Sequence, residues 1–108
     1  MQSLHLSAGT HAERHAVTTK ALDAIGRVGV VEDARQHSNK EVAIRFGLAA
    51  GRTAALAAEL DQLPIRLGAD SAAALAAVRD DEPVGGWLVI AFVHAEDDLR
   101  VTMPAVPG

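Results

Sequence analysis

The order of the secondary-structure elements expected between residues 2 and 68 constrains the fold of this chain most strongly. Alternating apolar and polar residues predict a strand around Leu4 and another along residues 41–48, because successive strand residues face opposite sides of a sheet. Polar turn residues at 36–40 precede the second of these strands and follow an apolar run that begins near Val28. This arrangement predicts a β-hairpin.

Two helices are expected to connect these strands. Thr10 can cap the first helix, and Gly26 stands where that helix is expected to end. Thr53 can cap the second helix, which Pro64 ends before a short strand at residues 65–67. Both helices carry apolar residues three or four positions apart, the pattern of a helix packed against a core.

Elements in this order predict an α+β fold, a ferredoxin-like βαββαβ antiparallel sheet with both helices on one face. We expect residues 1–108 to form a single domain, because a chain of this length builds one hydrophobic core. The ferredoxin-like unit is expected at residues 2–68, and residues 69–104 are expected to add a C-terminal helix and β-hairpin extension. In that hairpin, residues 87–93 are apolar on both strand faces, so both faces require cover from protein, and residues 99–103 form the second strand.

The unit at residues 2–68 resembles the small ligand-binding ACT module in its element order and in the small-residue loop at residues 7–9. ACT modules often carry an acidic residue with Pro and Gly in this loop, whereas residues 9–11 of this chain are Gly, Thr and His. The resemblance implies that a small molecule binds near this loop. The residues expected to contact it are Ser7, Gly9, Thr10 and His11.

The segment at residues 47–53 follows a strand and enters a helix, as a phosphate-binding loop does. It departs from that motif because Gly47 and Gly51 are separated by three residues rather than four, and because Arg52 replaces the Lys. A loop followed by a capping Thr accounts for the same residues. Anion binding at the helix N-terminus, assisted by Arg52, is a further ligand-binding hypothesis.

Composition excludes several classes of partner and chemistry. The net charge is −4 and the basic residues are scattered, so we expect no nucleic-acid partner. The chain has no cysteine, which excludes disulfides, thiolate metal ligands and a cysteine nucleophile. Its longest apolar run is far shorter than the roughly 20 residues of a membrane helix, and no targeting segment is recognisable. We therefore expect a cytoplasmic protein without a membrane partner, and no motif identifies a cofactor.

His11 and His15 are the candidate metal ligands. Four residues apart on the first helix, they would project from the same side, a spacing that lets two imidazoles share a metal ion. Solvated or capping histidines explain the same pattern, since no Glu follows the first His. His5 could add a third ligand only if its strand face turned towards the start of the helix. No catalytic motif such as a nucleophile elbow is present.

Trp87 is the only tryptophan. A core position is the default for such a side chain, but a sheet covered by helices on one side leaves its other face in need of cover. Gly85 and Gly86 are expected to free the backbone just before this strand. The residues expected at a self-association interface are Trp87, Val89, Ala91 and Val93.

We therefore expect a non-catalytic module that binds a small ligand or a partner and forms a homodimer. One alternative is a small dimeric α+β-barrel enzyme, in which two sheets enclose an apolar pocket and His5, His11 or His15 acts as an acid-base group. A second alternative is a metal-binding protein that uses His11 and His15.

Overall fold

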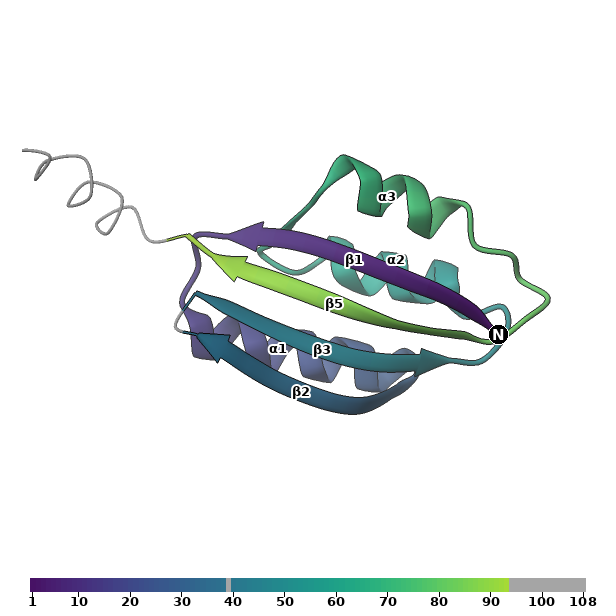
Figure 1. Ribbon diagram of the computed structural model, residues 1–108, viewed down its shortest axis with the longest axis horizontal. Helices are drawn as coiled ribbons and strands as arrows, with labels where there is room; N and C mark the ends of the chain where they lie inside the picture. The colour runs from purple at the N-terminus through teal and green to yellow at the C-terminus, as the bar shows by residue number, and fades with distance from the viewer. Residues whose placement is uncertain (39, 94–108) are drawn as a thin grey trace, which may run out of the picture.

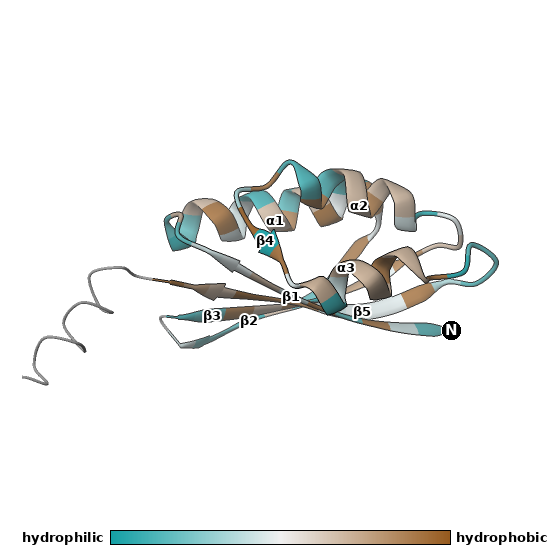
Figure 2. Cartoon of the chain, turned by 90° about the horizontal axis from the view of Figure 1, so that it is seen from above, coloured by the Kyte–Doolittle hydropathy of each residue, from teal (hydrophilic) through white to brown (hydrophobic). Residues whose placement is uncertain are grey.

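The computed structural model describes residues 1–38 and 40–93. In this part of the chain, five strands form one sheet, α1 and α2 lie on one of its faces, and α3 lies beside β1 (Figures 1 and 2). The elements in chain order are β1 (Gln2–Thr10), α1 (Arg14–Val28), β2 (Val30–Ser38), β3 (Glu41–Leu48), α2 (Thr53–Asp61), β4 (Arg66–Leu67), α3 (Ala69–Ala76) and β5 (Val84–Phe92). The fold is therefore of the mixed α+β class, with three helices in the described residues.

The strands lie in the order β2-β3-β5-β1-β4, and this corrects the expected ferredoxin-like sheet. β5 pairs in parallel with β1 and antiparallel with β3, so it occupies the centre of the sheet. The elements from β1 to β4 follow one another along the chain in the expected order, but the expectation of a ferredoxin-like antiparallel sheet was wrong, because the late apolar strand, rather than β3, is the neighbour of β1. Gly85 and Gly86 lie within β5 and do not precede it. The strand expected at residues 99–103 lies outside the described residues.

The apolar core lies between the sheet and the helices α1 and α2. Strand alternation supplies the sheet side of this core, where Leu6, Phe46 and Leu88 are at most 1% exposed. From the helices, Ile25 and Leu56 are fully buried against it. The alternation predicted for residues 41–48 and the hairpin formed by β2 and β3 are confirmed.

The first helix begins later than expected. Thr10 ends β1 instead of capping α1, because its hydroxyl donates a hydrogen bond to the carbonyl oxygen of Pro64 and accepts one from the backbone N–H of Ala12. The N-cap is Glu13, whose carboxylate accepts hydrogen bonds from two backbone N–H groups of the first turn. These hydrogen bonds hold the pKa of Glu13 below its usual value.

At its other end, α1 continues past Gly26 to Val28, so the expected end of the helix was also wrong. The cap there is Gly29, whose N–H donates to the carbonyl oxygen of Ile25 at 2.8 Å. None of the helices in the described part of the chain combines the length and the apolar character that a membrane span needs.

The helix α3 and the loop before it are fastened to the outer side of β1. The backbone N–H of Ser7 donates to the hydroxyl oxygen of Ser71 at 2.7 Å, and the N–H of Gly68 donates to the carbonyl oxygen of Ser7 at 2.9 Å. These bonds satisfy strand groups that would otherwise lack a neighbouring strand.

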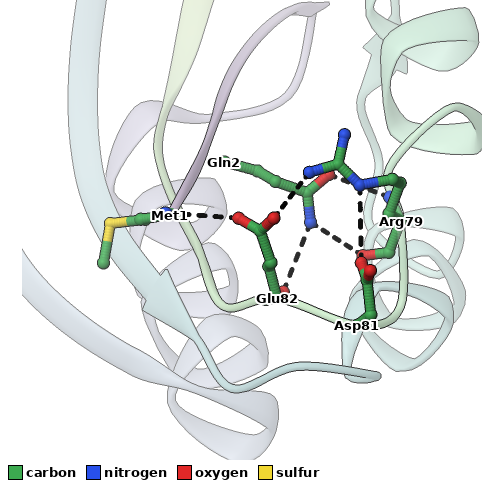
Figure 3. A network of polar contacts seen from close by, with 5 residues as sticks. All are labelled: Met1, Gln2, Arg79, Asp81 and Glu82. Carbon is green, nitrogen blue, oxygen red and sulfur yellow. Dashed lines mark hydrogen bonds and ion pairs between the residues drawn. The ribbon is translucent and has the colours of Figure 1, made fainter.

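A polar network joins the start of β1 to the loop before β5 (Figure 3). The side chain of Gln2 donates to the carbonyl oxygen of Arg79 at 2.7 Å and accepts from its N–H at 2.9 Å. The guanidinium of Arg79 also donates to the carboxylate of Glu82 at 2.7 Å, and the amino group of Met1 lies 3.3 Å from that carboxylate. The hydrogen bond from Arg79 is the main reason that the pKa of Glu82 is lowered.

Candidate functional site

The sheet face opposite α1 and α2 is the candidate functional surface, because no described helix covers it (Figure 2). We call this surface the open face. It carries the side chains of alternate residues from each strand, including His5 of β1, Arg45 of β3 and Trp87 of β5. Trp87 and Val89 are half-buried by their neighbours within the sheet, while His5 and Arg45 are exposed.

A row of cross-strand partners crosses the centre of the open face. The pairs are Asp33 with Arg45, Arg45 with Trp87, and Trp87 with His5. Directly paired residues of neighbouring strands project from the same face, so these four side chains are neighbours. The guanidinium carbon of Arg45 lies 5.9 Å from the centroid of the Trp87 ring, within the range of a cation–π interaction.

Four of the charged groups of the open face on β2 and β3 are paired locally, whereas Glu41 of β3 forms no ion pair within residues 1–38 and 40–93. The guanidinium of Arg35 donates to the carboxylate of Asp33 at 2.8 Å, which lowers the pKa of Asp33. Arg45 lies 3.6 Å from the carboxylate of Glu32. These contacts bring opposite charges together, so this half of the face presents neutral ion pairs beside Trp87.

Small side chains flank the row that contains Trp87. In register with Trp87 are His5 and Arg45, but the open-face positions one row away along the strands are largely Gly, Ala and Ser: Ser3, Ser7, Ala43, Gly47 and Gly85. Ala91 and Gly9 continue this surface towards the end of β5. Large side chains therefore form one row across the face, and on both sides of that row a second surface could approach the backbone closely.

Three of the four expected interface residues lie together. Trp87, Val89 and Ala91 project from the open face, whereas Val93 follows the end of β5 and is 37% exposed. The backbone N–H of Val93 donates to the carbonyl oxygen of Thr10 at 2.8 Å. The interface role expected of these residues remains a prediction.

The expected ligand-binding residues are divided between two ends of the sheet. Gly9, Thr10 and His11 line a hollow of about 530 Å³, together with Arg66. Ser7 is not part of its lining and is exposed on the open face.

Arg52 lines a different hollow, of about 490 Å³, beside Val84. Val84 pairs with Gln2 at the start of β1, whereas Thr10 pairs with Phe92 at the other end of β5. The chain therefore does not bring Arg52 to the loop at His11. The ligand-binding role of all five residues stays a prediction.

The two candidate metal ligands do not share a helix. His11 precedes α1 and His15 is its second residue, so the expectation that both project from one helical face was wrong. Among residues 1–38 and 40–93, no group of three or more His, Asp or Glu side chains could hold a metal ion. His5 lies beside Trp87 on the open face. Metal binding by His11 and His15 and histidine-dependent catalysis stay hypotheses.

Sequence reasoning missed Arg45. Its position in an alternating strand shows that it faces away from the core, but its contact with Trp87 depends on the register between β3 and β5, which no local pattern reveals. Comparisons with protein-family models, with curated proteins and with solved structures found no match. The arrangement of the open face is therefore the main support for a functional proposal.

Proposed function

We propose that this protein is a non-catalytic, cytoplasmic module that self-associates by packing its open face against the open face of a second copy. The observation that carries the proposal is Trp87, which lies at the centre of an uncovered sheet face, with rows of mostly small residues on either side of it along the strands. Sheets pack face to face about 10 Å apart in many folds, and these rows of Gly, Ala and Ser permit this approach.

The size of the open face is compatible with a dimer. Four long strands about 4.8 Å apart, each about nine residues long at roughly 3.3 Å per residue, give a face of about 570 Å². Two such faces bury about 1,100 Å², close to the lower limit of roughly 1,200 Å² for specific protein interfaces. This area predicts a reversible dimer.

The composition of the open face has the distribution expected of an interface. Trp87 and Val89 provide an apolar centre, and aromatic and Arg side chains dominate the binding energy of most interfaces. The charges of Asp33 and Arg45 are paired within one copy, by Arg35 and Glu32 respectively. Burial of these ion pairs would leave no isolated charge among them in the interface, which limits the desolvation cost.

Sedimentation equilibrium between about 1 and 100 μM tests the proposal, a range chosen because a weak dimer has a micromolar dissociation constant. Trp87→Ala is expected to raise that constant about 30-fold, the effect of a central interface residue. Ala91→Lys places a long side chain on the open face beside Glu41 and is expected to prevent dimerisation. The matched control, Ala58→Lys, makes the same change on the exposed side of α2 and should have no effect.

Two results would refute the proposal. The first is a parent protein that sediments as a monomer over the whole range. The second is a dimer that persists unchanged in the folded Ala91→Lys variant, since that dimer would use another surface. Circular dichroism of each variant verifies that the sheet is intact.

A further inference from the structure

A groove of about 460 Å³ runs between α2 and α3. The two helices stand apart in both overall views (Figures 1 and 2). The walls of the groove are mostly apolar, and the two helices contribute four alanines to them, namely Ala54, Ala57, Ala72 and Ala76. Leu75, which is 7% exposed, also lines it. The volume lies within the range of small-molecule sites, roughly 300–1,000 Å³.

Thr53 supplies a polar group at one end of this groove. It was expected to cap α2, but it is the first helical residue, and Arg52 occupies the N-cap position without a side-chain hydrogen bond. Thr53 lines the groove and is 6% exposed, and its hydroxyl oxygen has no hydrogen-bond partner in the described part of the chain. Buried hydroxyls are nearly always hydrogen-bonded, so an unpartnered one points to a missing binding partner.

The charged groups that line the groove are both acidic. Asp61 is the last residue of α2. Asp80 lies near the start of α2, because its carbonyl oxygen would be 3.9 Å from a Cβ atom placed on Gly51, just before this helix. Both side chains belong to exposed residues, and neither forms an ion pair within residues 1–38 and 40–93. Over the same residues, no basic side chain lines the groove.

We propose that this groove binds a small organic cation, an apolar chain or ring that ends in an ammonium group. The ammonium pairs with the carboxylate of Asp80, and a rotation of the Thr53 side chain on binding brings its hydroxyl oxygen, which is buried in the free protein, to accept a hydrogen bond from the ammonium. The apolar part lies along the alanine walls towards Asp61, over the roughly 13 Å that nine helical residues span. This site is on a different surface from the open face, so it does not depend on the proposed self-association.

The test is a titration of the ¹⁵N-labelled full chain with octylamine, octanol and octanoate, followed by NMR. The three ligands share one alkyl chain and differ in the charge of the head group. Octylamine is expected to shift the amide signals of α2 and α3 and to bind about fivefold more tightly than octanoate at low salt, because the lining charges are negative. Asp80→Asn should remove most of that difference while leaving octanol binding unchanged.

Two further variants and one control test where the ligand binds and whether it contacts the Thr53 hydroxyl. Ala57→Leu fills the groove and should abolish binding of all three ligands, whereas Ala58→Leu, at the next and exposed position, should leave binding unchanged. Thr53→Val keeps the shape of the side chain and removes the hydroxyl. It should weaken octylamine binding severalfold and raise the thermal stability of the free protein, because it deletes an unpartnered buried polar group.

The proposal is overturned by any of three results. In the first, the amide shifts do not saturate at octylamine concentrations below about 10 mM, so the affinity is too weak for a binding site. Octanoate could bind as tightly as octylamine, which would mark a neutral apolar site. The shifts could map to the open face and survive Ala57→Leu, which would assign the ligand to another surface.

Discussion

Two adjacent glycines in the central strand give different predictions for the same substitution. A Cβ atom on Gly86 would lie closer to the backbone carbonyl oxygen of Leu4 than the 3.0 Å below which real Cβ atoms essentially never approach. It would also be 3.1 Å from the ring of Phe46. A Cβ atom on Gly85, on the other strand face, would meet only the sulfur of Met1, at 3.0 Å, and this side chain is 84% exposed and free to move.

The magnitude follows from what must move. In Gly86→Ala, the clash is with the backbone of β1, so β1 and β5 must separate near the start of both strands. Overpacking of this kind typically costs about 1–3 kcal/mol, and one weakened ladder hydrogen bond adds about 1 kcal/mol. The loss of glycine flexibility offsets about 0.5–1 kcal/mol. We expect a net loss of about 1–3.5 kcal/mol for Gly86→Ala and a change within about 0.5 kcal/mol for Gly85→Ala.

Urea denaturation followed by circular dichroism measures both changes, with Gly85→Ala as the matched control. A loss of this size should lower the melting temperature of Gly86→Ala by roughly 10 °C in a domain of about 100 residues. The reasoning is refuted if Gly86→Ala unfolds at the same urea concentration as the parent. It is also refuted if the two variants lose equal stability, since backbone contact would then not distinguish them.

Two other predictions concern α1. Gly26 is exposed within the helix, and a Cβ atom there would have nothing within 4 Å. Gly26→Ala is therefore expected to raise the free energy of unfolding by about 0.5–1 kcal/mol, measured by denaturant titration. A decrease in this free energy would contradict the helical assignment. Because the pKa of Glu13 in the folded protein is below its usual 4.5, its capping contribution is present above that pH and is lost as the pH falls through the lower, folded value. The stability difference between the parent and Glu13→Gln should therefore shrink below pH 4.5 in acid titrations, and a constant difference would exclude this cap as its cause.

Local structure could be predicted from the sequence better than which strands lie side by side in the sheet. Alternation at Phe46 and its neighbours is visible within a few residues, so β3 and its hairpin with β2 could be predicted. The place of β5 could not, because its pairing with β1 joins segments as far apart as Gln2 and Val84. The prediction of where α1 starts failed for a similar reason. Thr10 is a preferred N-cap residue and Glu13 is not, but the hydroxyl of Thr10 bonds to Pro64, which is remote in the sequence, and Glu13 caps the helix instead.

The candidate surface was predicted in part. The apolar strand containing Trp87 and the uncovered face beside it were expected from the sequence, and both helices do leave that face open (Figure 2). The cation–π contact with Arg45 and the unpartnered hydroxyl of Thr53 could not be predicted, since each depends on how separate elements pack.

The two outer edges of the sheet differ in their capacity for growth. At the other edge, the two-residue β4 covers only part of β1, and the bonds from Ser71 and Gly68 to Ser7 already occupy further backbone groups that an incoming strand would need. At β2, the edge is exposed and carries charged residues, with irregular pairing at Val31 and Gln36. Addition of strands without limit requires two receptive edges per molecule. When two copies pair through their β2 strands, neither has another edge that can accept a strand. This architecture therefore resists fibre formation even at high protein concentration.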